Sequence, residues 1–144
     1  MSEIEVLIIS DEDLKPTMGN PGDAGYDLRS AIEVTLKAHE RSLIPTSVKI
    51  AMPQGIVGLV HPRSGLAAKN GITVLNAPGT VDSGYRGEVA VTLINHSDVD
   101  FDIKRGDRIA QIVFQKYETV KFIEVQELPG SQRGDAGFGS TGVK

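Results

Sequence analysis

The sequence predicts an all-β fold, a jelly roll or β-sandwich-like barrel, with one short helix and a flexible glycine-rich C-terminal tail. Eight short runs have β-type composition, turn signals separate them every 8–15 residues, and only one stretch has helical composition. The 144 residues suffice for a single core, and the absence of cysteine rules out disulfides and thiolate metal sites. We therefore expect a β domain at 1–128 and a lid at 129–144.

Taken in chain order, most elements are short and bounded by turn residues. Lys15–Gly25 is expected to be a loop, because it contains two prolines and three glycines. The expected helix, Ser64–Asn70, ends at Gly71. Apolar side chains occupy both alternating sets in Gly87–Asn95, so this strand is expected to be covered on both faces. The expected strands are Glu3–Ile9, Leu28–Leu36, Ser42–Met52, Ile56–His61, Ile72–Leu75, Gly87–Asn95, Arg108–Lys116 and Val120–Glu127.

Charge and composition exclude several classes of function. The net charge of −4 argues against non-specific nucleic-acid binding, for which a basic face supplies most of the affinity. The three histidines, His39, His61 and His96, lack the spacing of a metal site, so any metal is expected to be a hard cation on oxygen ligands. The apolar run Val6–Ile9 is too short for a signal or a membrane span, which predicts a soluble, cytoplasmic protein that binds no membrane.

The segment His61–Leu66 has the outline of a phosphate site. Arg63 and Ser64 stand where a strand gives way to the short helix, so a guanidinium, a hydroxyl and backbone N–H groups can face one anion. The alternative is an ordinary helix start with Ser64 as its N-cap.

The segment Asn76–Gly87 indicates two strand ends around a tight glycine-rich hairpin that carries Asp82 and Tyr85. If phosphates bind nearby, Asp82 is the natural base for a water, and Tyr85 is a flat wall against a sugar. Otherwise the carboxylate only closes the turn.

Acidic residues occur in two further segments. Asp23 and Asp27 end the first loop, whereas Asp107 precedes Arg108 and Gln111 at the entry of a strand. Carboxylates near a triphosphate imply Mg²⁺, bound directly or through its waters, because bare carboxylates would repel the ligand. Solvated salt bridges are the competing interpretation of both segments.

The tail, Pro129–Lys144, has five glycines among its sixteen residues. Ordering it costs roughly 1–2 kcal/mol per residue, so we expect it to become ordered only over a ligand. It carries Arg133, Phe138 and the hydroxyl side chains of Ser140 and Thr141, which suit a nucleotide lid; the alternative is a disordered tail.

These segments, in this order, resemble the five motifs of the trimeric dUTPases (deoxyuridine triphosphate nucleotidohydrolases). One departure is Ala136, where the family often has glycine. The matching segments are Ala24–Leu28, Pro62–Gly71, Asn76–Gly87, Arg105–Gln111 and Arg133–Gly142.

The resemblance implies a jelly-roll homotrimer whose active sites lie at subunit interfaces. It implies hydrolysis of dUTP to dUMP and diphosphate, which keeps uracil out of DNA and supplies dUMP for thymidylate synthesis. Asp82 would activate the water that attacks the α-phosphorus, Tyr85 would exclude a 2′-hydroxyl, and Asp27 would hold Mg²⁺ through its water shell.

The remaining roles are also implied by the resemblance. Uracil would be read by the hairpin and covered by the tail, while basic and polar side chains would bind the phosphates. The hairpin residues are Asn76, Thr80, Val81 and Ala90; the phosphate residues are Arg63, Ser64, Gly65 and Gln111; the supporting residues are Asp107 and Arg108; the tail residues are Arg133, Phe138, Gly139, Ser140 and Thr141.

Two alternatives come from other classes of function. A dCTP deaminase has a similar fold and several similar motifs, but that family places a catalytic glutamate where this chain has Thr92. A nucleotide-sensing module would bind without turnover, although every catalytic-type residue, Asp82 included, is present. Deamination of dCTP would support the deaminase alternative. Binding of dUTP without release of diphosphate would support the nucleotide-sensing module.

Overall fold

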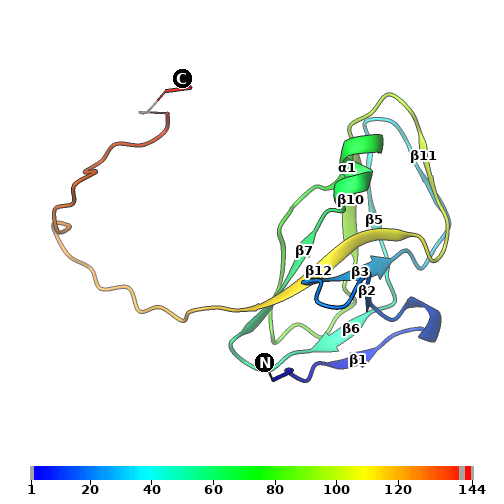
Figure 1. The fold of residues 1–144 in the computed structure, drawn as a ribbon, viewed down its shortest axis with the longest axis horizontal. Coiled ribbons are helices and arrows are strands. Elements are labelled where there is room, and N and C mark those ends of the chain that lie inside the picture. The colour runs from blue at the N-terminus through cyan, green and yellow to red at the C-terminus, as the bar shows by residue number, and fades with distance from the viewer. Residues whose placement is uncertain (1, 140–141, 144) are drawn as a thin grey trace.

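The computed structural model describes residues 2–139 and 142–143. Its strands are short and mostly joined by tight turns, and one α-helix and one 3₁₀ helix interrupt them (Figure 1). The elements are β1 (Leu7–Ile9), η1 (Glu12–Leu14), β2 (Thr17–Met18), β3 (Gly25–Arg29), β4 (Val34–Leu36), β5 (Arg41–Ile44), β6 (Lys49–Ala51), β7 (Ile56–His61), α1 (Ser64–Asn70), β8 (Ile72–Val74), β9 (Gly79–Val81), β10 (Val91–Asn95), β11 (Phe101–Ile103) and β12 (Arg108–Lys116).

All of the strand pairs are antiparallel. The largest sheet has the order β2-β3-β12-β7-β9, and a second sheet has the order β5-β10-β8. Two further pairs, β1-β6 and β4-β11, complete the fold. Apart from β2 and β3, neighbours in both main sheets are not consecutive in the chain, as expected for a jelly-roll-like β fold rather than a series of hairpins. The predicted fold class is therefore confirmed.

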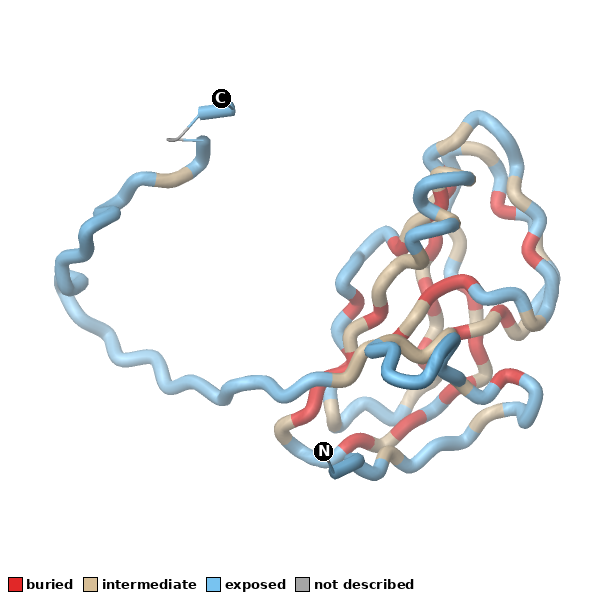
Figure 2. Tube along the Cα trace, viewed as in Figure 1, coloured by how far each residue is buried: buried red, intermediate tan, exposed pale blue. Residues whose placement is uncertain are grey.

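One hydrophobic core joins the two main sheets. Leu28 and Ile112 come from the five-stranded sheet, Ile44 and Leu93 from the three-stranded sheet, and all four are almost fully buried. Along β10, for example, buried positions alternate with half-buried ones, and Figure 2 shows buried stretches interspersed with exposed and half-buried ones through the body of the fold. On β10 the side chains on one face are buried, while those on the other face are half-buried, so a single chain covers one of its faces completely.

The short helix begins and ends at the predicted residues. Gly71 adopts the left-handed conformation, with φ of 67°, and its N–H donates to the carbonyl of Ala67 at 3.2 Å. At the other end, the N-cap is Arg63, without a side-chain cap, and Ser64 is the first helical residue. The alternative role of Ser64 as the N-cap is therefore wrong.

Several strand predictions differ from the structure. Leu28–Leu36 is divided into β3 and β4, because the hydroxyl of Ser30 bonds both the N–H and the carbonyl of Ile32 and turns the chain. Ser42–Met52 is divided into β5 and β6 around Ser47, whose φ is 66°. The strands β2 and β11 were not predicted.

The hairpin predicted at Asn76–Gly87 is wrong: its first strand end forms β9, which pairs with β7 instead of a neighbouring strand end, and residues 82–90 form no strand.

The predicted strand Val120–Glu127 is wrong for this chain. The segment is exposed and pairs with no described strand, and an extended segment without a neighbour has no ladder of hydrogen bonds. The chain leaves the body after the N–H of Tyr117, which donates to the carbonyl of Gly55 at 3.1 Å. From there it runs outward, away from the sheets (Figure 1). The boundary at 128/129 stays a prediction.

Within the described residues, no helix has the length and apolar character needed to cross a membrane.

Candidate active site

The five-stranded sheet brings three of the five predicted motifs side by side. Gln111 on β12 lies opposite Asp27 of β3 on one side and opposite His61 of β7 on the other. Arg63 follows two residues after His61, so the first, second and fourth motifs meet at one region of the sheet.

A polar groove of about 470 Å³ lies at this junction. Its walls come from the loop before β3, from β3 itself and from β12. The carboxylate of Asp23 accepts the N–H of Asn20 at 2.9 Å, which closes the loop on one side. Carboxylate, amide and guanidinium groups therefore face one open space, as a ligand with both phosphates and polar atoms requires. The polar side chains of the lining are Asn20, Asp23, Asp27, Arg108 and Gln111.

One arginine, Arg108, lines this groove, and a second, Arg63, contacts the backbone of the first. Nη1 of Arg108 lies 3.7 Å from Oδ2 of Asp27, whose side chain is only 17% exposed. Nη1 of Arg63 donates to the backbone carbonyl of Arg108 at 3.1 Å. Such partly exposed contacts add little to stability, but they restrict where the guanidinium groups can lie. Asp27 is thus paired with Arg108, which was predicted to be a supporting residue.

Gln111 is held by two neighbours. Its Nε2 donates to the carbonyl of Pro62 at 3.1 Å, and its side chain lies directly against Gly25. A Cβ atom at position 25 would overlap Oε1 of Gln111 and would lie 3.0 Å from Cδ. Gly25 is therefore a functional position that the sequence analysis missed; the available signal was a glycine inside a strand, which often marks a close approach.

Replacing Gly25 by alanine is expected to lower kcat/KM for dUTP by about 10- to 100-fold, because the methyl group displaces the Gln111 amide by roughly 1 Å. Steady-state kinetics on Gly25→Ala, Gln111→Ala and the double variant checks this. Because both changes act through Gln111, their effects should be strongly non-additive.

Gly130→Ala is the matched control, since no atom lies within 4 Å of a Cβ built there. Wild-type kcat/KM in Gly25→Ala would show that the Gln111 amide does not need its observed position.

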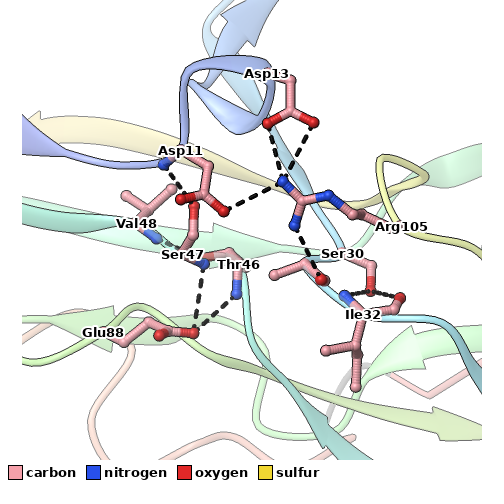
Figure 3. Close-up of polar contacts among 10 residues, drawn as sticks. Asp11, Asp13, Ser30, Ile32, Thr46, Ser47, Val48, Glu88 and Arg105 are labelled. Atoms are coloured by element: carbon pink, nitrogen blue, oxygen red, sulfur yellow. Dashed lines mark hydrogen bonds and ion pairs between the residues drawn. The ribbon is translucent and has the colours of Figure 1, made fainter.

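Asp107 and Arg105 maintain the turn that leads into β12. The Asp107 carboxylate accepts the N–H of Lys104 at 2.8 Å. Nη2 of Arg105 contacts the carboxylates of Asp11 at 3.2 Å and Asp13 at 2.9 Å (Figure 3). The hydrogen bond to Asp11 is the main cause that raises the pKa of Arg105. These contacts position the start of β12 and leave the Asp107 carboxylate engaged in its own turn.

Asp82 lies at the opposite end of this sheet from Arg63. It follows Val81, which pairs with Gly58 on β7, so Asp82 is level with Val57. Arg63 lies six residues further along the chain than Val57. At the rise per residue of a strand, Asp82 and Arg63 are therefore roughly 20 Å apart along the sheet. The exposed Asp82 carboxylate therefore does not reach Arg63 of its own chain.

The other predicted residues of this segment, which is called the hairpin below, lie between residues 76 and 90. Tyr85 is 46% exposed, its hydroxyl donates to the carbonyl of Glu88 at 2.9 Å, and its ring covers Gly87. Val81 is buried, Thr80 is exposed and Ala90 is half-buried; the Asn76 amide lies beside Gly79.

The described part of the tail lies away from both regions. Nε of Arg133 donates to the carbonyl of Ala136, so it bonds within the tail, and Phe138 is fully exposed. Gly139 has a φ of 82°, which suits glycine. The remaining two predicted tail residues, Ser140 and Thr141, lie outside the described residues.

Comparisons with known proteins support the same interpretation. The dUTPase family profile matches residues 12–142. The deoxyuridine 5′-triphosphate nucleotidohydrolase of Bifidobacterium longum subsp. infantis is 56% identical over 146 residues, which cover 96% of this chain and 90% of the relative. The nucleotidohydrolase of Nocardia farcinica is 53% identical over 128 residues, which cover 88% of this chain and 78% of that relative.

Solved structures agree as well. A variant dUTPase of Staphylococcus bacteriophage 80alpha with dUpNHpp aligns with a TM-score of 0.89 at 28% identity, covering 96% of this chain and 99% of that one. A variant dUTPase from phage phi11 of S. aureus, described with a structural Mg(II) ion, aligns with a TM-score of 0.79 at 26% identity, covering 88% and 99%.

The fold, the polar groove and these matches define a hydrolase that acts on a nucleoside triphosphate. More narrowly, the chain belongs to the dUTPase family. The predicted family and activity, hydrolysis of dUTP to dUMP, are confirmed, and the deaminase alternative is set aside.

Proposed function

We propose that this chain hydrolyses dUTP in sites shared between the subunits of a homotrimer. The observation that carries the proposal is the separation of Asp82 from the second motif: Asp82 lies about 20 Å along the sheet from Arg63. A carboxylate at that distance cannot activate a water at a phosphate that Arg63 of the same chain binds. A second copy must therefore present its hairpin to the groove of the first.

In this arrangement the groove side binds the triphosphate. Arg63 and the backbone at Ser64 and Gly65 bind phosphate oxygens, and Gln111 contacts the region of the α-phosphate. Arg108, paired with Asp27 at 3.7 Å, keeps that carboxylate oriented toward the groove. The net effect is a site in which positive charge from arginines offsets the charge of the substrate.

The donors at the groove fit Mg²⁺ bound mainly by substrate. No group of three or more His, Cys, Asp or Glu residues forms a cage among the described residues, but Asp27 offers one carboxylate oriented at the groove. Mg²⁺ retains several waters and commonly combines one or two carboxylates with phosphate oxygens. Bound there, it would neutralise charge on the phosphates, with Asp27 contacting its water shell.

The hairpin side supplies the reacting base. The Asp82 carboxylate accepts a proton from water as the water oxygen bonds to the α-phosphorus. The bond from the α-phosphorus to the oxygen that bridges to the β-phosphorus breaks, and diphosphate leaves with that bonding pair. Tyr85 packs on the deoxyribose and leaves no room for a 2′-hydroxyl.

Base recognition belongs to the same hairpin. Backbone groups at Thr80, Val81 and Ala90, together with the Asn76 amide, pair with the edge of uracil. Because backbone donors and acceptors have fixed polarity, cytosine would leave buried groups unpaired and be rejected by about 10⁴-fold or more.

The tail then closes over the nucleotide, with Phe138 on the base and Arg133, Ser140 and Thr141 on the outer phosphates. Because the substrate is an intracellular metabolite, a cytoplasmic location is part of the proposal.

Mixing two inactive variants tests the shared site. Asp82→Asn subunits keep a normal groove, and Gln111→Ala subunits keep a normal hairpin. In randomly mixed trimers, about a quarter of the shared sites combine the two intact halves, so about a quarter of wild-type activity should return. Diphosphate release from dUTP, measured after refolding the two proteins together at equal concentration, gives the result.

Absence of recovery, with mixed trimers demonstrated by two different affinity tags, would place the whole site in one subunit. The wild type should release diphosphate from dUTP and not from dCTP, dTTP or UTP, with Mg²⁺ present. Saturable dUTP binding without any release would instead indicate the nucleotide-sensing module.

A further inference from the structure

We infer that Glu88 is a positioning residue for Tyr85 and thereby for discrimination against ribonucleotides. Its carboxylate attaches the end of the hairpin to the turn between β5 and β6, and its carbonyl holds the Tyr85 hydroxyl. The inference rests on the proposed role of Tyr85 at the sugar. Neither the motif resemblance nor the groove assigns a role to Glu88.

The first contact joins Tyr85 to the backbone of Glu88. The Tyr85 hydroxyl donates to the Glu88 carbonyl at 2.9 Å, and the N–H of Ala90 donates to the same oxygen at 3.0 Å. The Tyr85 ring lies against Gly87, where a Cβ atom would come within 2.6 Å of the Tyr85 Cζ. The plane of the ring is therefore determined by the conformation of residues 87–88.

The second contact attaches this backbone to the body of the domain. Oε2 of Glu88 accepts the N–H of Thr46 at 3.1 Å and the N–H of Ser47 at 3.4 Å (Figure 3). Ser47 has a φ of 66°, a turn conformation in which successive N–H groups can converge on one acceptor. Hydrogen bonds to a charged acceptor are about twice as strong as those between neutral groups.

The turn that receives Glu88 is partly buried and hydrogen-bonded to its surroundings. Thr46 is fully buried; its hydroxyl donates to the Val89 carbonyl and accepts the N–H of Val48 at 3.2 Å. The N–H of Val89 donates to the Val48 carbonyl at 2.7 Å. Glu88 therefore joins an exposed hairpin to an ordered part of the core.

The rest of the hairpin has few other connections to the body. Among the described residues, the hydrogen bonds of Tyr85 and Arg86 run to Asp82, Ser83, Glu88 or each other. Asp82, by contrast, follows β9 directly, and the pairing of Val81 with β7 limits its movement. Loss of the Glu88 carboxylate should therefore displace Tyr85 more than Asp82.

The test compares kcat/KM for dUTP with kcat/KM for UTP. Glu88→Ala should lower the dUTP/UTP ratio by about 10-fold or more, mainly through faster UTP hydrolysis, while kcat for dUTP changes much less. Glu88→Gln should keep most of the selectivity, because its amide oxygen can still accept both N–H groups. Glu33→Ala, at an exposed glutamate outside the hairpin, is the matched control.

Tyr85→Phe tests the same link without altering Glu88, since it removes only the hydroxyl bonded to the Glu88 carbonyl. It should also lower the ratio, and it remains informative if Glu88→Ala does not fold. Combining Glu88→Ala with Tyr85→Ala should add little to Tyr85→Ala alone, because both act through one ring.

Two outcomes separate this inference from the proposed function. If Tyr85→Ala lowers the ratio but Glu88→Ala and Tyr85→Phe leave it unchanged, Glu88 is not a positioning residue and the role of Tyr85 stands. If Tyr85→Ala leaves the ratio unchanged, the proposed sugar contact fails, and the inference fails with it. An equal loss of kcat/KM for both nucleotides in Glu88→Ala would indicate a purely structural role and overturn the inference.

Discussion

Replacing Asp82 by asparagine is expected to lower kcat for dUTP by about 10²–10⁴-fold or more, with dUTP binding nearly unchanged. The asparagine side chain has the same shape but cannot take a proton from water. The Asp82 side chain is exposed and makes no hydrogen bond to other described residues, so the fold does not depend on its charge. Diphosphate release and equilibrium binding of a non-hydrolysable dUTP analogue measure the two quantities separately.

Glu33→Gln, at another exposed carboxylate, is the matched control and should keep wild-type kcat. Unchanged turnover in Asp82→Asn would contradict the assignment of the base. A large loss of binding with kcat preserved would show instead that the carboxylate holds the substrate.

Removing every residue after Gly130 is expected to leave a folded trimer and to lower kcat/KM for dUTP by about 10²-fold or more. The hydrogen bonds of the described tail residues after Gly130 are internal to the tail, for example from Gly134 to Ser131 at 3.0 Å. Its loss should therefore leave the thermal midpoint nearly unchanged. What is lost is the lid that, by our proposal, covers the base and the outer phosphates.

Thermal unfolding, size-exclusion chromatography and diphosphate release distinguish the outcomes. A variant with Phe138→Ala and Arg133→Ala in the full-length chain keeps the tail length and should reproduce most of the kinetic loss. A monomeric or unfolded truncated protein would show that the tail is structural. Wild-type kcat/KM after truncation would remove the tail from the catalytic cycle.

Elements with strong local signals were predicted with their observed bounds. Both β7 and β12 are rich in β-type residues, and α1 ends at Gly71 in the left-handed conformation that glycine favours. The predictions were wrong where a contact between residues distant in the sequence determines the local structure. Ser30, for instance, interrupts a predicted strand while its N–H bonds the carbonyl of Asp107 from the far end of the chain. Likewise, Val120–Glu127 has a strand composition but no partner strand among the described residues.

The residue types that carry the chemistry of the site were also predicted from local patterns. Three local patterns predicted the chemistry of the site. Arginine and serine at a strand-to-helix junction indicated phosphate binding, and an aspartate in a glycine-rich segment indicated a base. A glycine-rich tail with an arginine indicated a nucleotide lid. Gly25 and Glu88 were not predicted, because their importance comes from Gln111 and Thr46, which are distant in the sequence. A glycine in a strand and a glutamate after a turn are both common without such partners.

The amino-acid sequence alone thus specifies an all-β chain of one family, the residue types of its chemistry and the bounds of elements such as α1 and β7, since these depend on neighbours within a few residues. The tertiary structure decides which of these residues meet. Register across β3, β12 and β7 aligns Asp27, Gln111 and His61, whereas the antiparallel pairing of β9 with β7 carries Asp82 to the other end of the sheet. Strand pairing is a long-range choice set by the packing of the whole core, so no local segment encodes it.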